Sequence, residues 1–510
     1  MIGVTDLNAF EYNKKFRTKE DNILSRVIHF HDETLRDGPQ SLWAMRMRYG
    51  AYEAVAEDLD TVGYTAIDFP AQAAYLKLAT REFKENFWDT LNLMRKKVVK
   101  TPITIDIDNC LDLINLEDPP CMIDLWWRTV VKNLGAKKCW SMVGIRDEVK
   151  NDLPTLVPLI RELGLKWSPA CAYAISPRHT DEHYVKLVEG LMPYKPDSIW
   201  IKDADGLLTP ERAKTLIPAM MKAANGVPIE LHSHGCSTME PALICTAMQL
   251  GVDTIHTCVR PLAFGTSKCA IDLAVKNAHS LGFETDVNLD RIGEIERKLT
   301  MIAKEDNLPI GRPMEFDVRT FKHMIPGGVI SNTVYQLEKL GIPDKIDEVL
   351  EEVPRIHAEM GYPVMITPPS QFIVSQAAVN VATGERYKVV LNCMVDMALG
   401  RYGVDDAGLA DMDQNLKDRL LSTPTAKARA KKFEEMAERA HEVTVEQIRR
   451  DMGMMDASDE DFLYAYVMNG DKEVKACTTP KQYYTGANPL GLLLHRLGKD
   501  HDISRLEMKR

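Results

Sequence analysis

Four side chains that could bind a single metal ion stand at the carboxyl ends of predicted strands in this chain of 510 residues. They belong to Asp37, Lys202, His232 and His234. An ammonium group cannot bind a cation, but a lysine that has reacted with CO2 carries a carbamate, whose oxygens are anionic ligands. With that modification the four residues would form a divalent-metal site of one carboxylate, one carbamate and two imidazoles. Such a ligand set suits zinc, manganese or cobalt, and the sequence does not choose among them.

The spacing of the two histidines supports this hypothesis. His232 and His234 are two residues apart, so on an extended backbone both side chains leave the same face and can reach one ion. Each residue alone has a simpler explanation, because strand histidines are often structural, Asp37 could cap a helix and Lys202 could form an ion pair. The argument therefore depends on all four residues meeting at strand ends.

The elements that must bring them together are short apolar, β-rich runs that alternate with helical patterns. Strands alternating with helices predict βαβ units and a parallel sheet, and eight strands in about 250 residues fit an α/β fold of the (β/α)8 TIM-barrel type. An open doubly wound sheet is the alternative, but it usually has a Gly-rich turn after the first strand, which is missing here. The predicted strands cover residues 27–32, 64–69, 103–108, 138–143, 166–172, 198–202, 228–232 and 253–258.

The chain is expected to have four parts: an N-terminal extension at 1–25, a barrel domain at 26–290, a mainly helical C-terminal domain at 291–480 and a tail at 481–510. After about residue 290 no strand is predicted. Helical patterns cover 291–303, 344–360, 387–400 and 426–451, and loop-like segments lie at 325–328 and 366–371.

Composition limits the classes of function. The formal net charge of −11 argues against non-specific nucleic-acid binding, which needs clustered positive charge. Ten cysteines are scattered without a CxxC pair, as is typical of reduced thiols in a cytosolic protein. No segment reaches the roughly 18 uninterrupted apolar residues of a membrane span. We expect a cytoplasmic protein that binds neither nucleic acid nor membranes.

Several ordered motifs resemble one family. Thr-Leu-Arg-Asp-Gly-Pro-Gln-Ser at 34–41 resembles the first-strand signature of metal-dependent barrels that perform aldol-type, Claisen and carboxyl-transfer chemistry. Ile-Lys-Asp-Ala-Asp-Gly-Leu-Leu at 201–208 is similar to the segment with the carbamylated lysine in biotin-dependent carboxyltransferases, which include pyruvate carboxylase, the oxaloacetate decarboxylase alpha chain and the large transcarboxylase subunit. Pro-Gly-Gly at 326–328, Ser-Asn at 331–332, Gly-Tyr-Pro at 361–363 and Thr-Pro at 367–368 resemble their C-terminal domain.

The resemblance, which covers about residues 27–403, implies a mechanism and a set of site residues. CO2 would move from carboxybiotin to the enolate of a small carbonyl acceptor, whose carbonyl is polarised by a metal on Asp37, carbamylated Lys202, His232 and His234. Arg36 and Gln40 would hold the acceptor oxygen beside the metal. Thr367 would carry the proton between biotin and acceptor, although a threonine before proline is equally a plain turn residue. Ser370 and Gln371 are implied as biotin contacts.

The resemblance also implies partners. No biotinyl domain and no ATP-grasp-like region are recognised in the sequence. The biotin carboxyl carrier protein and the biotin carboxylase are therefore expected to be separate subunits of a multi-subunit complex. Related barrels commonly form dimers, so a homodimer is expected.

One departure from the family bears on the acceptor. Relatives that use pyruvate or oxaloacetate have an arginine after the third strand, which binds the substrate carboxylate. Here that stretch contains Asp106 and Asp108, and a carboxylate would be repelled if either faced the substrate pocket. We therefore expect an acceptor other than pyruvate. The alternative is that both aspartates lie outside the pocket or pair with Arg46, Arg48 or Arg146.

Three other functions remain open. The same site could act as a biotin-dependent decarboxylase. A Claisen-type lyase or synthase acting on an acyl-CoA would use the histidines but would not need Lys202 as a ligand. A scaffold subunit without turnover would have no need of the complete ligand set.

Overall fold

The computed structural model describes residues 26–111, 118–325, 329, 333, 337–338, 341–440 (436–440 in backbone only), 442–470 and 472–486. The expected N-terminal extension at 1–25, the motif residues 326–328 and 331–332, and positions 487–510 of the tail lie outside these ranges.

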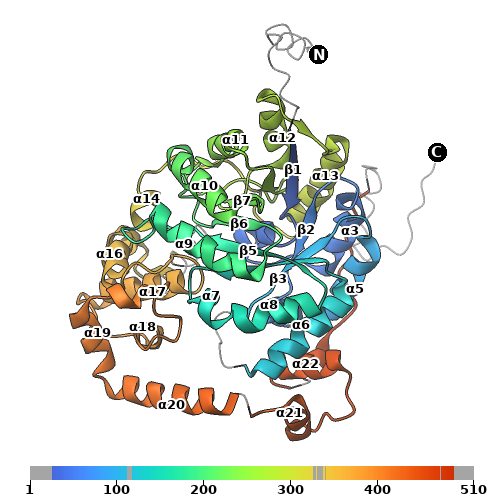
Figure 1. The fold of residues 1–510 in the computed structure, drawn as a ribbon. Coiled ribbons are helices and arrows are strands. Elements are labelled where there is room, and N and C mark those ends of the chain that lie inside the picture. Colours follow the sequence, from blue (N-terminus) through green and yellow to red (C-terminus); the bar gives the residue numbers. More distant parts are fainter. Residues whose placement is uncertain are drawn as a thin grey trace, which may run out of the picture.

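Eight parallel strands close into a barrel at the centre of the molecule (Figure 1). Each strand pairs with its sequence neighbours, and β1 joins both β8 and β2, which closes the sheet. The predicted barrel is therefore confirmed, with most strand limits within two residues. The strands are β1 (Val27–Asp32), β2 (Ala66–Phe69), β3 (Ile103–Asp106), β4 (Lys138–Val143), β5 (Lys166–Ala172), β6 (Ile199–Asp203), β7 (Ile229–Ser233) and β8 (Thr254–Thr257). A short strand that was not predicted, β9 (Glu284–Thr285), pairs with the start of β1.

Helices follow the strands and cover the outside of the barrel (Figure 1). Local signals explain where they begin: α10 starts at Pro210, a residue suited to the first helical position, and the side chain of Thr209 accepts a hydrogen bond from the backbone N–H of Arg212. The helices of the barrel are α2 (Asp37–Leu42), α3 (Tyr49–Leu59), α4 (Ala73–Leu78), α5 (Phe87–Lys97), α6 (Pro120–Leu134), α7 (Glu148–Asn151), α8 (Leu153–Glu162), α9 (Asp181–Leu191), α10 (Pro210–Ala224), α11 (Glu240–Leu250) and α12 (Ile271–Ser280).

Helices dominate the rest of the described chain, as predicted. These helices are α13 (Leu289–Glu305), α14 (Thr320–His323), α16 (Ile346–Glu359), α17 (Pro369–Thr383), α18 (Asn392–Ala398), α19 (Gln414–Leu421), α20 (Pro424–Ala440), α21 (Val445–Asp451) and α22 (Asp459–Met468). Two details differ from the sequence interpretation. The predicted helix at 426–451 is two helices, α20 and α21, and the predicted loop at 366–371 already contains the first turn of α17, because Pro369 suits a helix start.

The two largest hydrophobic cores among the described residues lie in the barrel and in the helical region after it. The second core centres on α16 and α17, where Val353 and Ile356 are fully buried. The barrel core also includes Leu299 of α13 and Phe462 of α22. Leu299 and Phe462 lie beyond the expected barrel limit at residue 290 but pack in the barrel core, so α13 and α22 belong to the barrel by packing. The four-part division stays a proposal, with α13 and α22 added to the barrel part.

Two segments next to the helices of the second core, around Ile366 and at 404–406, dock beside the carboxyl ends of β4 and β5. Ile366 packs in one cluster with Ala172 and Ala174 at the end of β5, and Ala204 after β6 contacts the same cluster. The carboxylate of Asp147 accepts hydrogen bonds from the backbone N–H groups of residues 404–406. This docking brings the 364–371 segment to the end of the barrel where active sites of this fold form.

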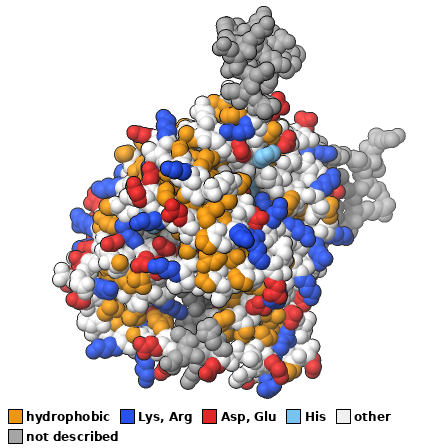
Figure 2. Space-filling view, in the orientation of Figure 1, with side chains coloured by type: hydrophobic (Ala, Val, Ile, Leu, Met, Phe, Trp, Pro, Cys, Tyr) orange, Lys and Arg blue, Asp and Glu red, His pale blue; other side chains and the backbone are white. Residues whose placement is uncertain are grey.

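Acidic and basic side chains are both spread over the face shown in Figure 2. Among the described residues, no helix combines the length and apolar character needed to cross a membrane.

Candidate active site

The predicted ligands lie at the carboxyl ends of β1, β6 and β7. Asp37 is the first residue of α2, just after β1, and Lys202 and His232 are paired neighbours in the register of β6 and β7. His234 directly follows β7. Gly206 lets the loop after β6 pass close to His234: its φ is +66°, and a Cβ there would lie 2.5 Å from the His234 carbonyl oxygen.

Three of the ligand atoms converge on one point. The Nε2 atoms of His232 and of His234 each lie 3.0 Å from Oδ2 of Asp37. The Nζ atom of Lys202 lies 3.0 Å from Nε2 of His232 and 4.4 Å from the centre of the Trp140 ring. All four side chains are buried. The structure therefore brings the four predicted ligands together.

The hydrogen bonds on the far side of each imidazole set its tautomer. Nδ1 of His232 donates to Oε1 of Glu33 at 3.0 Å, and Nδ1 of His234 donates to the Thr266 carbonyl at 2.7 Å. Both Nε2 lone pairs are then directed at Asp37. Metal-binding histidines are generally held this way, so the donor set fits a divalent metal.

The surroundings shift the pKa values of Lys202, His232 and Asp37 toward the protonation states that can bind a metal. Burial is the main cause that lowers the pKa of Lys202, with Arg36 a second cause. Burial and Lys202 lower the pKa of His232. Burial opposes ionisation of Asp37, but Arg36 and Lys268 outweigh it and hold the pKa of that carboxyl well below its usual range. The site thus combines a carboxylate with a neutral imidazole at His232.

Arg36 lies beside the ligands in a fixed orientation. Its Nη2 donates to Glu33 at 2.8 Å and its Nε donates to Asp68 at 2.7 Å. Its Nη1 donates to Oε1 of Gln40 at 3.3 Å, and the Tyr75 hydroxyl donates to the same oxygen. Two predicted residues, Arg36 and Gln40, therefore contact each other next to Asp37.

Sequence reasoning missed Lys268. This lysine follows β8 and is fully buried, with its Nζ bonded to Oδ2 of Asp37 and 3.1 Å from Nε2 of His234. The one sequence feature that could have pointed to Lys268 is its place after the eighth predicted strand. That signal was weak, because ten residues separate Lys268 from the end of β8.

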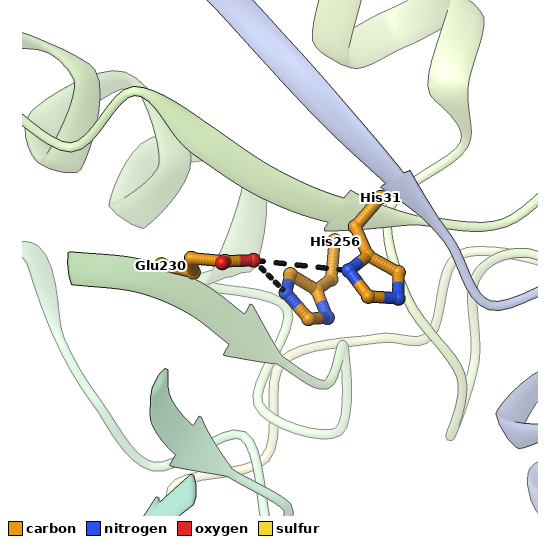
Figure 3. Close-up of side chains that lie close together, drawn as sticks. All are labelled: His31, Glu230 and His256. Atoms are coloured by element: carbon orange, nitrogen blue, oxygen red, sulfur yellow. Dashed lines mark hydrogen bonds and ion pairs between the residues drawn. The ribbon is translucent and has the colours of Figure 1, made fainter. Parts of the chain in front are cut away.

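A second group missed from the sequence lies deeper in the barrel (Figure 3). Oε2 of Glu230 lies 3.2 Å from Nε2 of His256 and 3.7 Å from Nδ1 of His31. The two imidazole rings are stacked, 4.2 Å apart and 20° from parallel, so one ion cannot lie in both ring planes. Nδ1 of His256 donates to the same Glu33 oxygen as His232 does, at 2.9 Å. Glu33, Glu230 and His256 therefore form a hydrogen-bond network beneath the proposed ligands, and His31 stacks on His256 at ion-pair distance from Glu230.

The two aspartates of the predicted substrate pocket have different surroundings. Asp106 ends β3, and although burial raises its pKa, Arg36 and Lys202 are close enough to oppose that effect. Asp108 accepts a hydrogen bond from Gln72, and burial raises its pKa to about 6 against the opposing charge of Arg146.

These surroundings correct one inference. The expectation of an acceptor other than pyruvate assumed unopposed acidic charge. Arg36 lies close enough to Asp106, and Arg146 close enough to Asp108, to oppose their negative charge. The argument against a carboxylate substrate therefore loses its basis.

The remaining predicted residues lie in the segment docked on the barrel. Thr367 is half-buried and directly follows Ile366, which packs with Ala204 two residues after Lys202. Ser370 is fully buried, and its hydroxyl has no hydrogen-bond partner among the described residues. Gln371 is half-buried in the first turn of α17.

Two family models match the chain: an HMGL-like domain over residues 141–299 and a conserved carboxylase domain over residues 320–484. The chain is 32% identical over 380 residues to a pyruvate carboxylase subunit of Methanocaldococcus jannaschii, covering 74% of this chain and 66% of that relative. It is 29% identical to the 2-oxoglutarate carboxylase large subunit of Hydrogenobacter thermophilus, covering 77% of this chain and 60% of the relative.

It is also 29% identical to the methylmalonyl-CoA carboxyltransferase 5S subunit of Propionibacterium freudenreichii subsp. shermanii, covering 75% of each chain. Among solved structures, the carboxyl transferase domain of Rhizobium etli pyruvate carboxylase has a TM-score of 0.74 at 21% identity, covering 87% of this chain and 75% of that one, which shows the shared fold. The two matched domains and the relatives agree with the ligand geometry: the chain belongs to the carboxyltransferase family of the biotin-dependent carboxylases.

Proposed function

We propose that this protein is the carboxyltransferase subunit of a multi-subunit biotin-dependent carboxylase. It would take CO2 from carboxybiotin on a separate carrier protein and transfer it to a small acceptor with an enolisable carbonyl. The observation that carries the proposal is the convergence of both histidine Nε2 atoms on Asp37 Oδ2, with Lys202 Nζ 3.0 Å from His232.

We assign the metal to Asp37, carbamylated Lys202, His232 and His234, and zinc, manganese or cobalt would suit them. When bound, the metal would supply a Lewis acid that polarises the acceptor carbonyl. Lys202 is suited to carbamate formation because its Nζ is buried beside Trp140 and His232.

The other residues act on the acceptor and on biotin. Arg36, fixed by Glu33 and Asp68, would donate to the acceptor oxygen together with the Gln40 amide. Thr367 would pass its hydroxyl proton to the biotin ureido nitrogen from which CO2 has left and take up the proton of the acceptor in its place. The docked segment around Ile366 would exclude water from this reaction. The Ser370 hydroxyl is buried and has no hydrogen-bond partner among the described residues, and we assign it as a biotin contact.

The relatives guide the choice of acceptor. One is named for pyruvate, one for 2-oxoglutarate and one for methylmalonyl-CoA. We propose a 2-oxo acid as the acceptor class, with pyruvate as the first to test. The predicted partners, a biotin carboxyl carrier protein and a biotin carboxylase, and the homodimer belong to the same proposal.

The test is carboxyl transfer from a carrier loaded with [14C]carboxybiotin to each candidate acceptor, measured as acid-stable radioactivity. Wild type should transfer label to one acceptor, and Lys202→Ala should lose transfer by at least a hundredfold. The matched control is Lys298→Ala, which removes an ion pair with Asp58 far from the ligands. Transfer of label from a [14C]carboxylated 2-oxo acid to unloaded carrier, without the opposite transfer, would instead indicate a decarboxylase.

The HMGL-like match supports one alternative, a Claisen-type lyase or synthase acting on an acyl-CoA. The two functions differ in their need for Lys202. If acyl-CoA is turned over without biotin and Lys202→Ala keeps that activity, the carboxyltransferase proposal is wrong.

A further inference from the structure

Lys268 holds the same atoms that a metal would use. Its Nζ is bonded to Oδ2 of Asp37 and lies 3.1 Å from Nε2 of His234, and its side chain has no exposed surface. A lysine buried to this degree requires partners that compensate its charge. Here the partners are two of the proposed metal ligands.

The electrostatics explain why the ammonium is favourable there. Oδ2 of Asp37 lies 3.0 Å from each histidine Nε2, and all three atoms present lone pairs. Such atoms repel one another in a buried site unless a cation lies among them. Lys268 supplies positive charge and N–H donors to Asp37 and His234, and Lys202 contacts His232.

A metal ion and this ammonium exclude each other. The Nε2 atom of His234 has one lone pair, which can accept a hydrogen bond or bind a metal but cannot do both. A divalent cation would also be repelled by an ammonium that shares its ligands.

We propose that Lys268 is a built-in cation of the metal site, which occupies Asp37 and His234 in the metal-free protein and must leave them when a metal binds. This inference rests on the proposed function, because it concerns the same site. Two consequences follow. The protein keeps its ligands in place without a metal, and its affinity for metal is lower than the ligand set alone would give.

The test is the affinity for Mn2+ of protein stripped with a chelator, measured by the electron paramagnetic resonance signal of free Mn2+ in bicarbonate buffer. Lys268→Met removes the charge, and we expect it to bind Mn2+ at least tenfold more tightly than wild type. Lys268→Gln keeps a polar group and should shift the affinity in the same direction if the methionine variant does not fold. Lys298→Met is the control, since it removes a lysine of α13 that pairs with Asp58 of α3 and with none of the proposed ligands, and it should match wild type.

The outcomes separate this inference from the proposed function. Equal affinity in wild type and both Lys268 variants would refute the built-in cation while leaving the metal site intact. Weaker binding in the variants would show that Lys268 supports the metal, which also overturns the inference. If wild type, variants and control all fail to bind Mn2+, Zn2+ or Co2+ by equilibrium dialysis, the metal site itself is refuted, and the proposed function with it.

Discussion

One carboxylate oxygen of Glu33 accepts hydrogen bonds from His232 at 3.0 Å and from His256 at 2.9 Å. The other oxygen accepts from Arg36 at 2.8 Å. Although burial opposes its ionisation, Arg36 and His232 hold the pKa of Glu33 well below its usual range. Glu33 therefore links a proposed metal ligand, a proposed acceptor-binding arginine and the deeper histidine network.

Replacing Glu33 should loosen the metal site. In Glu33→Gln the negative charge opposite His232 is lost, and removal of such partners typically weakens metal binding by about 10–100-fold. Equilibrium dialysis with Mn2+ would measure the change. Asp181→Asn, which alters an ion pair with Arg212 away from the ligands, serves as the control. An unchanged affinity would mean that Glu33 does not orient His232.

Glu240 should make stability depend on pH. Burial raises the pKa of this carboxyl to about 8, whereas an unfolded glutamate ionises near about 4.3. As the pH rises, the unfolded chain loses its proton first, so stability is full below pH ~4.3 and falls until pH ~8. The side chain in Glu240→Gln does not titrate. Across that window the free energy of unfolding of the variant should therefore rise relative to wild type by up to about 1.4 kcal/mol per pH unit. Urea unfolding of both proteins at several pH values would measure this gain, and a constant difference would contradict the assignment.

Helix α13 should behave as part of the barrel. Leu299 is fully buried in the barrel core, so Leu299→Ala should cost about 2–5 kcal/mol of unfolding free energy. Leu289→Ala on the same helix removes a side chain that is 40% exposed and should cost far less. Urea unfolding followed by tryptophan fluorescence compares them. Similar small losses in both variants would place α13 outside the barrel unit.

The buried hydroxyl of Ser370 should matter for biotin and little for folding. It lacks a partner among the described residues, so Ser370→Ala removes an unsatisfied polar group and should leave stability equal or higher by about 1 kcal/mol. The KM for carboxylated carrier should rise severalfold with a smaller change in kcat. Ser280→Ala at the exposed end of α12 is the control. A KM equal to wild type would remove Ser370 from the biotin site.

The barrel could be predicted because strands buried on both faces are apolar runs, and the alternation with helices excludes most other topologies. The convergence of Asp37, Lys202, His232 and His234 could be predicted because strand ends are defined by the same runs. The buried network of Glu230 and His256 could not be predicted. A charged or imidazole side chain inside a strand does not reveal which residues of other strands will form hydrogen bonds or ion pairs with it. Lys268 reaches the site through a loop whose path depends on tertiary contacts. The predicted roles of Arg36, Gln40, Thr367, Ser370 and Gln371 stay predictions, as do those of Asp106 and Asp108.

The pairing of Lys202 with His232 across β6 and β7 has a consequence for folding. A slip of one residue in that register would turn one of the two side chains to the opposite face of the sheet. Asp37 begins α2 directly after β1, the strand that pairs with β8 where the barrel closes. The ligands are therefore assembled only in chains whose sheet has closed in the correct register, and the stoichiometry of bound metal would count the correctly folded molecules in a preparation.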